Sequence, residues 1–86
     1  MDLSTYGGLE VYILIAIEPK SNMSKVEKKV LKLPRLYEVM EILGRYEVMA
    51  RFRVRNKEQL VDIIDKISNI DGIKDYLVLI VTKKLK

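Results

Sequence analysis

The sequence predicts an α+β domain in which four strands form one antiparallel sheet and two helices pack on one face of it. Two segments are apolar on both strand faces, two carry apolar stripes at helical spacing, and a hairpin with one glycine lies between the helical segments. Their order is β-α-β-β-α-β, the ferredoxin-like arrangement. Right-handed crossovers then predict the spatial strand order 4-1-3-2.

The first strand is expected over Leu9–Glu18, where the sequence reads LEVYILIAIE. One face consists of aliphatic residues, and Tyr12, Leu14 and Ala16 occupy the other. A strand that is apolar on both faces is typically covered on both faces. Pro19 is expected to end the strand because it lacks the N–H that a sheet needs.

The first helix is expected in SNMSKVEKKVLKLPR. Ser24 and Glu27 have the spacing of a capping box, with Ser21 or Asn22 as alternative caps. Pro34 is expected to stop the helix. The lysines between the apolar positions predict a solvated face. The apolar stripe consists of Met23, Val26, Val30 and Leu33.

A hairpin is expected next, with strands over Leu36–Leu43 and Tyr46–Val54 and a turn at Gly44. Alternation places Tyr46, Val48, Ala50, Phe52 and Val54 on one face of its second strand. The opposite face carries Glu47, Met49, Arg51 and Arg53.

The second helix is expected in NKEQLVDIIDKISNI, with Asn56 as N-cap and Gln59 as its capping-box partner. Its apolar stripe consists of Leu60, Ile63, Ile64, Ile67 and Ile70. Gly72 is expected to close the helix in a left-handed conformation. The last strand is expected over Ile73–Lys84 and is again apolar on both faces.

Two helices can cover only one face of this sheet. The other face is also apolar on the first and last strands, and Met40 and Ile42 extend it onto the second. An uncovered apolar face of this kind marks an interface. The sequence therefore predicts a homodimer that buries sheet against sheet.

Composition excludes several functions. The 86 residues suffice for one domain, and they include no cysteine or histidine, which excludes thiolate or imidazole catalysis and Cys/His metal sites. No glycine-rich phosphate loop is present, and the loop EPKSNMSK lacks the glycine and arginine of acylphosphatase-like enzymes. We therefore expect no enzyme, no catalytic residue, no cofactor and no metal.

The surroundings of the protein are also constrained. The longest apolar run, Val11–Ile17, has 7 residues, so no membrane span is expected. The first residues lack a secretory pattern, which favours the cytoplasm. The scarcity of Asn and Gln beside many Lys, Ile and Glu suggests a thermophile.

Four stretches, VYILIAIEP, LPRLYEV, LGRYEVMARFRV and IDGIKDYLVLIV, occur in an order and spacing that resemble a known family. It is the effector-sensing regulatory (RAM) domain of Lrp/AsnC transcription regulators, and the resemblance covers about residues 10–84. It implies a role in transcription regulation, through a higher oligomer such as an octamer-like ring of dimers. A small effector, an amino acid by this resemblance, would bind in clefts between neighbouring dimers.

The resemblance also implies the effector-binding residues. One wall of the cleft would consist of Gly44, Arg45, Tyr46 and Glu47. The other wall, from a neighbouring dimer, would consist of Gly72, Asp75, Tyr76 and Val78. Asp75 could accept a hydrogen bond from a ligand ammonium, and Tyr76 could donate one to a carboxylate. The chain departs from the family pattern in having Glu47 where Asp is usual, and Tyr76 and Val78 where threonines are common.

The domain organisation follows from the same resemblance. Residues 1–9 are expected to be an N-terminal arm or the remnant of a linker, and residues 10–86 the effector-sensing domain. DNA would be contacted only through a separate helix-turn-helix domain or a partner.

A nucleic-acid-binding module of the same topology, similar to RNA-recognition modules, is the alternative. Arg51, Arg53 and Arg55 alternate along one strand and could form a basic sheet face. Aromatic residues are missing from that face of the strand, and pairing of the arginines with Glu38 and Glu41 on the adjacent strand would neutralise it.

Overall fold

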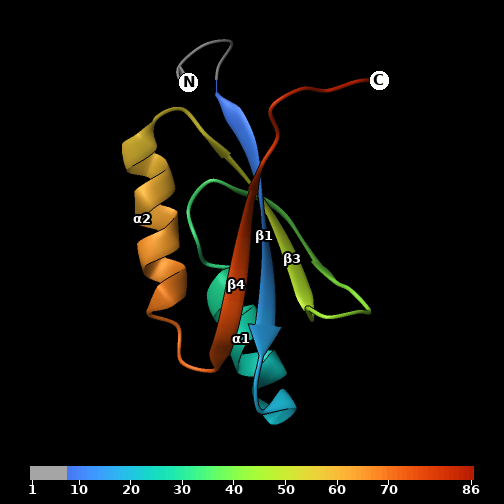
Figure 1. The fold of residues 1–86 in the computed structure, drawn as a ribbon. Helices are drawn as coiled ribbons and strands as arrows, with labels where there is room; N and C mark the ends of the chain where they lie inside the picture. The colour runs from blue at the N-terminus through green and yellow to red at the C-terminus, as the bar shows by residue number, and fades with distance from the viewer. Residues whose placement is uncertain (1–7) are drawn as a thin grey trace.

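The computed structural model describes residues 8–86, so most of the predicted arm lies outside the described residues. The strands are β1 (Leu9–Ile17), β2 (Leu36–Glu41), β3 (Val48–Val54) and β4 (Ile73–Ile80). A 3-10 turn, η2 (Lys20–Asn22), leads into helix α1 (Met23–Val30), and helix α2 (Lys57–Ser68) follows β3. The sheet is antiparallel with the order β2-β3-β1-β4, which confirms the predicted topology (Figure 1).

The hydrophobic core lies between one face of the sheet and the two helices. Alternate residues of β1 and β3 fill its sheet side, and Phe52 is its largest fully buried side chain. Val26 and Val30 enter it from α1, and Ile63 and Ile67 from α2. The predicted apolar stripes of the helices therefore face the sheet as expected.

Helix α1 starts at one of the two alternative caps, Asn22, and ends earlier than predicted. It starts at Met23 with Asn22 as N-cap, so Ser24 lies inside the helix and the predicted Ser24–Glu27 capping box is wrong. The side chain of Asn22 makes no capping hydrogen bond. The helix ends at Val30, before Pro34, because the Leu33 amide bonds the Val30 carbonyl at 3.0 Å and tightens the last turn.

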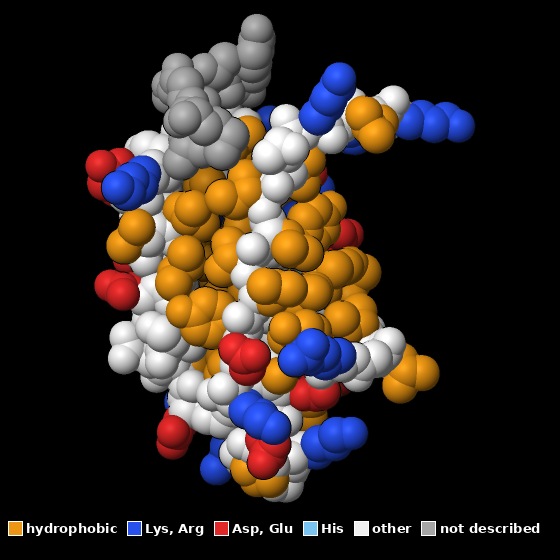
Figure 2. All heavy atoms as spheres, in the orientation of Figure 1, with side chains coloured by type: hydrophobic (Ala, Val, Ile, Leu, Met, Phe, Trp, Pro, Cys, Tyr) orange, Lys and Arg blue, Asp and Glu red, His pale blue; other side chains and the backbone are white. Residues whose placement is uncertain are grey.

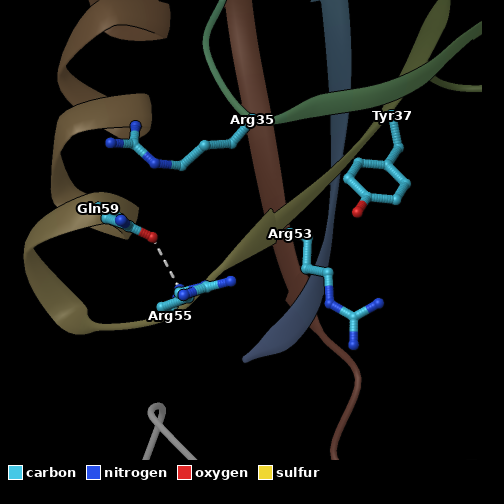
Figure 3. A pocket seen from close by; sticks show the side chains of 5 residues that line it. All are labelled: Arg35, Tyr37, Arg53, Arg55 and Gln59. Atoms are coloured by element: carbon cyan, nitrogen blue, oxygen red, sulfur yellow. Dashed lines mark hydrogen bonds between the residues drawn. The ribbon is translucent and has the colours of Figure 1, made fainter. Parts of the chain in front are cut away.

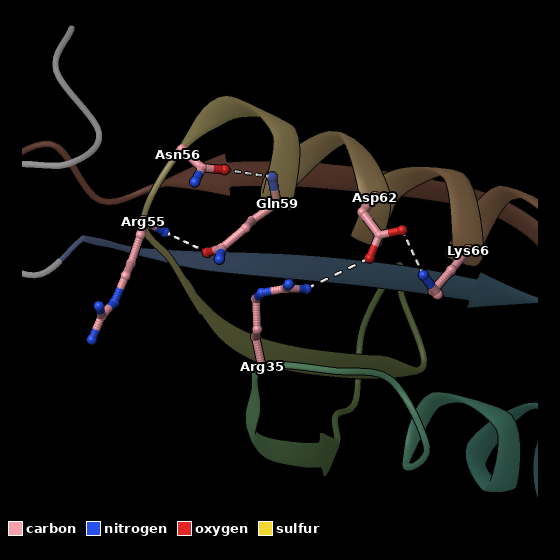
Figure 4. Close-up of polar contacts among 6 residues, drawn as sticks. All are labelled: Arg35, Arg55, Asn56, Gln59, Asp62 and Lys66. Atoms are coloured by element: carbon pink, nitrogen blue, oxygen red, sulfur yellow. Dashed lines mark hydrogen bonds and ion pairs between the residues drawn. The ribbon is translucent and has the colours of Figure 1, made fainter.

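Helix α2 begins as predicted. Asn56 Oδ1 accepts from the Gln59 amide at 2.8 Å, and Gln59 Oε1 accepts in return from the Arg55 amide at 2.8 Å (Figure 4). Gly72 has φ of 100°, and a Cβ there would lie 2.9 Å from a methyl of Val26. Both the positive φ and the close packing therefore require glycine. The prediction that Gly72 closes the helix is wrong, however, because α2 ends at Ser68 with Asn69 as its C-cap.

The strands are shorter than predicted. Strand β3 starts at Val48, so Tyr46 and Glu47 precede it, and β2 ends at Glu41, so Ile42 follows it. Strand β4 ends at Ile80, which pairs with Val11 near the start of β1. Only Leu9 and Glu10 of β1 lie beyond this pair, so the residues after Ile80 have almost no strand to pair with. The predicted extension of the last strand to Lys84 is therefore wrong.

Two glutamates meet on the helix side of the sheet. Glu41 pairs with Val48 in the β2–β3 ladder, so its side chain faces the helices and lies next to Glu27 of α1. The hydrogen bond that protonated Glu27 donates to Glu41 raises the pKa of Glu27, and partial burial and the like charge add to the rise. The predicted pairing of Glu41 with the arginines of β3 is therefore wrong.

The glutamate pair predicts a pH-dependent stability. A raised pKa in the folded state means that the pair favours folding at low pH and loses this contribution as pH rises through the pKa of Glu27. Glu41→Gln should therefore raise the melting temperature at pH 7, with a gain that shrinks toward pH 4, near the usual pKa of about 4.3 for Glu. Asp71→Asn, at an exposed position, is the matched control. A gain independent of pH would contradict the proposed pairing.

Candidate functional site

The face of the sheet away from the helices is apolar and uncovered, and we call it the open sheet face. Leu14 of β1 is at its centre, between Leu77 of β4 and Met49 of β3. Leu77 and Leu79 are 42% and 45% exposed. Its apolar members are Tyr12, Leu14, Ala16, Tyr37, Met40, Met49, Leu77 and Leu79. Figure 2 shows hydrophobic side chains gathered on the side of β4 that faces away from α2.

The Arg51 charge on this face is neutralised by two acids. Arg51 lies 3.0 Å from Glu10 on β1 and 3.4 Å from Glu38 on β2, and its guanidinium lies 5.2 Å from the centre of the Tyr37 ring. The predicted pairing with Glu38 is therefore confirmed. With Arg51 held in this way, the sheet lacks a continuous basic row for nucleic acid, and a protein partner fits it better.

Of the first predicted cleft wall, Glu47 has the most defined surroundings. Its side-chain Oε1 accepts from the Ile17 amide at 2.6 Å, and its own amide donates to the Ile15 carbonyl at 2.9 Å. Its carbonyl accepts from the Ile42 amide at 3.0 Å. Glu47 therefore ties the base of the β2–β3 hairpin to the end of β1.

The rest of this wall forms the hairpin turn. Gly44 has φ of 155°, and a Cβ added there would meet no atom within 4 Å. Arg45 is exposed and Tyr46 is partly buried. The turn thus presents backbone and a cation at the surface.

The second predicted wall divides between the two faces of β4. Asp75 pairs with Ala16 on the open sheet face, and its Oδ1 accepts from the Tyr76 amide at 2.8 Å. Tyr76 and Val78 point to the helix side and pack against the core. A ligand that contacts both Asp75 and Tyr76 would have to lie along the free edge of β4. Gly72 precedes the strand, and its carbonyl accepts from the Glu18 amide at 3.1 Å.

Both walls lie at the same end of the sheet, on opposite sides of β1. Ile15 pairs with Val48 on one side and with Tyr76 on the other. Two strand spacings separate the segments, which is about 10 Å. One protomer therefore presents both predicted segments at one end, where either could meet a neighbouring molecule.

The sequence interpretation missed Lys74 at this end. Its Nζ lies 2.9 Å from Glu18, and the hydrogen bond that its ammonium donates to Glu18 raises the pKa of Lys74, with smaller contributions from Glu47 and Asp75. An ammonium among carboxylates can hold a ligand that carries both charge signs, as an amino acid does. A β-bulge between Ala16 and Ile17 places Lys74 here, and simple alternation does not reveal a bulge.

Other kinds of site are not found in the described part of the chain. Across residues 8–86, no three acidic side chains come together as metal ligands would. Neither α1 nor α2, the two described α-helices, has the length and hydropathy to cross a membrane.

Comparison with known proteins identifies relatives of the whole domain. The family model of the Lrp/AsnC ligand binding domain matches residues 10–86. The HTH-type transcriptional regulator FL11 of Pyrococcus furiosus is 31% identical over 77 residues, which cover 88% of this chain and 51% of FL11. The chain thus spans about half the length of this regulator. Homocitrate synthase of Sulfolobus acidocaldarius is 27% identical over 77 residues, covering 87% of this chain but 16% of that enzyme.

Solved structures share the fold. Escherichia coli AsnC superposes with a TM-score of 0.83 at 23% identity, covering 91% of this chain and 53% of that one. TTHA0845 from Thermus thermophilus has a TM-score of 0.83 at 20% identity and covers 91% and 98% of the two chains. The regulator NMB0573 from Neisseria meningitidis, solved in complex with L-Met, has a TM-score of 0.81 at 18% identity and covers 99% and 54%.

The geometry at Glu47 predicts a defined stability loss. Glu47→Ala leaves the Ile17 amide without its acceptor, which should lower the free energy of unfolding by about 1–3 kcal/mol in a urea titration. Glu47→Gln keeps an oxygen acceptor and should lose less. Equal stability of the alanine variant and the wild type would show that the bond to Ile17 contributes nothing.

Proposed function

The chain belongs to the Lrp/AsnC ligand binding domain family, and we propose that it is the effector-sensing and oligomerisation module of a transcription regulator. The observation that carries the proposal is the open sheet face, which is apolar at its centre and where Arg51 is paired with acids. Strand β1 supplies apolar residues to both faces, while the helices cover only one.

A second copy of the chain is the proposed cover of this face. Two such sheets pack about 10 Å apart, with the side chains of their inner faces interdigitating. Burial of a leucine such as Leu77 contributes about 1.5–3 kcal/mol when it is complete. Arg51 would enter the interface already paired with Glu10 and Glu38, which limits the cost of burying its charge.

The proposed effector is an amino acid, bound between dimers of a higher, octamer-like assembly. The hairpin turn of one dimer, Gly44 to Glu47, would face the segment of the next dimer that contains Gly72, Asp75, Tyr76 and Val78. The mixed charges of Glu18, Lys74 and Asp75 support a zwitterionic ligand. The L-Met complex of NMB0573, a protein of the same fold, supports the choice of an amino acid.

Effector binding would act on assembly. A ligand that fits the cleft in one assembly state better than in another shifts the population toward the first, by no more than its difference in binding free energy. DNA would be bound by a separate helix-turn-helix domain or partner, in the cytoplasm. The regulators related to this chain are about twice its length, which supports such a division.

The domain itself is proposed to be non-catalytic. The same domain is similar to half of a transcription regulator and to 16% of homocitrate synthase. A transcription regulator and a biosynthetic enzyme can both use a domain that senses a small molecule.

The dimer predicts the effect of a charge at its centre. Leu77→Lys would place an unpaired ammonium in the sheet–sheet interface and should convert the dimer to monomers at micromolar concentration, observed by sedimentation velocity. Val61→Lys, at a 48% exposed position on α2, is the matched control and should keep the wild-type assembly. Identical sedimentation of the two variants would remove the open sheet face from the interface.

The effector site predicts ligand-dependent stability. In a thermal-shift screen of the twenty amino acids, an effector at 100 times its Kd should stabilise the domain by about 2.7 kcal/mol and raise the melting temperature by several degrees. Tyr76→Thr should change which amino acid does so. If no amino acid raises the melting temperature of the wild type, an amino-acid effector is excluded. If the Tyr76→Thr variant responds to the same amino acid as the wild type, Tyr76 does not belong to the site.

A further inference from the structure

A hollow lies at the end of the sheet opposite the proposed effector site, where β2 begins and β3 ends. It has a volume of about 460 Å³, and its walls contain no acidic residue (Figure 3). Strand β3, which separates it from the proposed effector site, is 7 residues and therefore about 20 Å long. We call it the arginine pocket, and its lining residues are Arg35, Tyr37, Arg53, Arg55 and Gln59.

The fold makes little use of two of these arginines. Arg51, two residues before Arg53 on β3, is paired with acids on both neighbouring strands. Within residues 8–86, by contrast, the guanidinium groups of Arg53 and Arg55 form no ion pair or hydrogen bond. Arg55 contributes only its backbone amide, to Gln59. Among the described residues, both guanidinium groups therefore lack a partner and remain available to a ligand.

Arg35 is held at the pocket by an unusual backbone. Its φ is 63°, a left-handed conformation that is uncommon in residues other than glycine. Its guanidinium lies 3.5 Å from Asp62, which also pairs with Lys66 on α2 (Figure 4). Two cations thus share one exposed carboxylate, and an exposed ion pair adds little to stability. The fold gains little from an arginine here, whereas strained residues of this kind cluster at functional sites.

We propose that the arginine pocket binds a small molecule that carries a phosphate group. Guanidinium forks match the oxygens of a phosphate in bidentate hydrogen bonds. The Tyr37 hydroxyl and the Gln59 amide add neutral donors from opposite sides of the pocket (Figure 3). The N-terminus of α2, which Arg55 and Gln59 border, adds positive potential. The volume lies in the range of small-molecule sites.

The site is tested by titrating the 86-residue protein with inorganic phosphate and pyrophosphate in about 0.15 M NaCl, an ionic strength that screens exposed charges. NMR signals of the arginine Nε–H groups report the binding. We expect saturable shifts at Arg35, Arg53 and Arg55, larger with pyrophosphate, and no shift at Arg51. Shifts that do not saturate and spread over all basic residues would overturn the proposal.

Variants separate a binding role from a structural one. Arg53→Ala and Arg55→Ala should each weaken pyrophosphate binding roughly tenfold or more, because each removes charge-assisted hydrogen bonds. Lys29→Ala, which removes the same charge from the exposed face of α1, should bind as the wild type does. Equal affinity of all three variants would overturn the proposal.

Two further experiments test the role of Arg35 and whether the pocket prefers a small molecule to a nucleic acid. Arg35→Gly should weaken binding without lowering the melting temperature, because glycine adopts the positive φ freely. A lowered melting temperature with unchanged binding would instead assign Arg35 to the fold and overturn its place in the site. A short DNA duplex that binds more tightly than pyrophosphate, and loses this affinity in Arg53→Ala, would overturn the small-molecule assignment in favour of nucleic acid.

Discussion

The structure depends on one strand that is apolar on both faces. β1 lies between β3 and β4, and its alternate residues Ile13 and Ile15 are fully buried beneath the helices. Leu14, between them, points to the other side and is flanked by Leu77 and Met49. The chain covers the first set with two helices and leaves the second set open. Burial of this second set is what connects the fold of one molecule to the proposed assembly.

Much of the fold could be predicted because it follows local periodicity. Alternation in β1 and β3 assigned their apolar residues to the correct faces, and the Asn56 cap on the Gln59 amide could be read from residue types three positions apart. The start of α1 could not be predicted from the sequence, because Ser21, Asn22 and Ser24 all qualify as caps and tertiary packing decides between them. The limits of β3 depend on Glu47, whose bond to Ile17 joins residues 30 positions apart.

The candidate site could be predicted only in part. The family resemblance supplied its two segments, and the structure shows them at one end of the sheet on either side of β1. It did not supply Lys74, the extra residue of β4 at its register shift against β1, whose ammonium pairs with Glu18. Arg35 was missed for a related reason. A left-handed arginine after Pro34 leaves no mark in composition or periodicity, so the arginine pocket could be found only from the folded chain.

The most direct test of the account measures whether the open sheet face is covered in solution. A soluble paramagnetic agent broadens the methyl NMR signals of exposed side chains, and Leu43 and Leu31, exposed in the structure, serve as internal references. If a second copy covers the face, the methyl signals of Leu14, Leu77 and Met49 should be protected as well as those of the core residue Ile13. Broadening of Leu77 to the same extent as Leu43 would contradict the account.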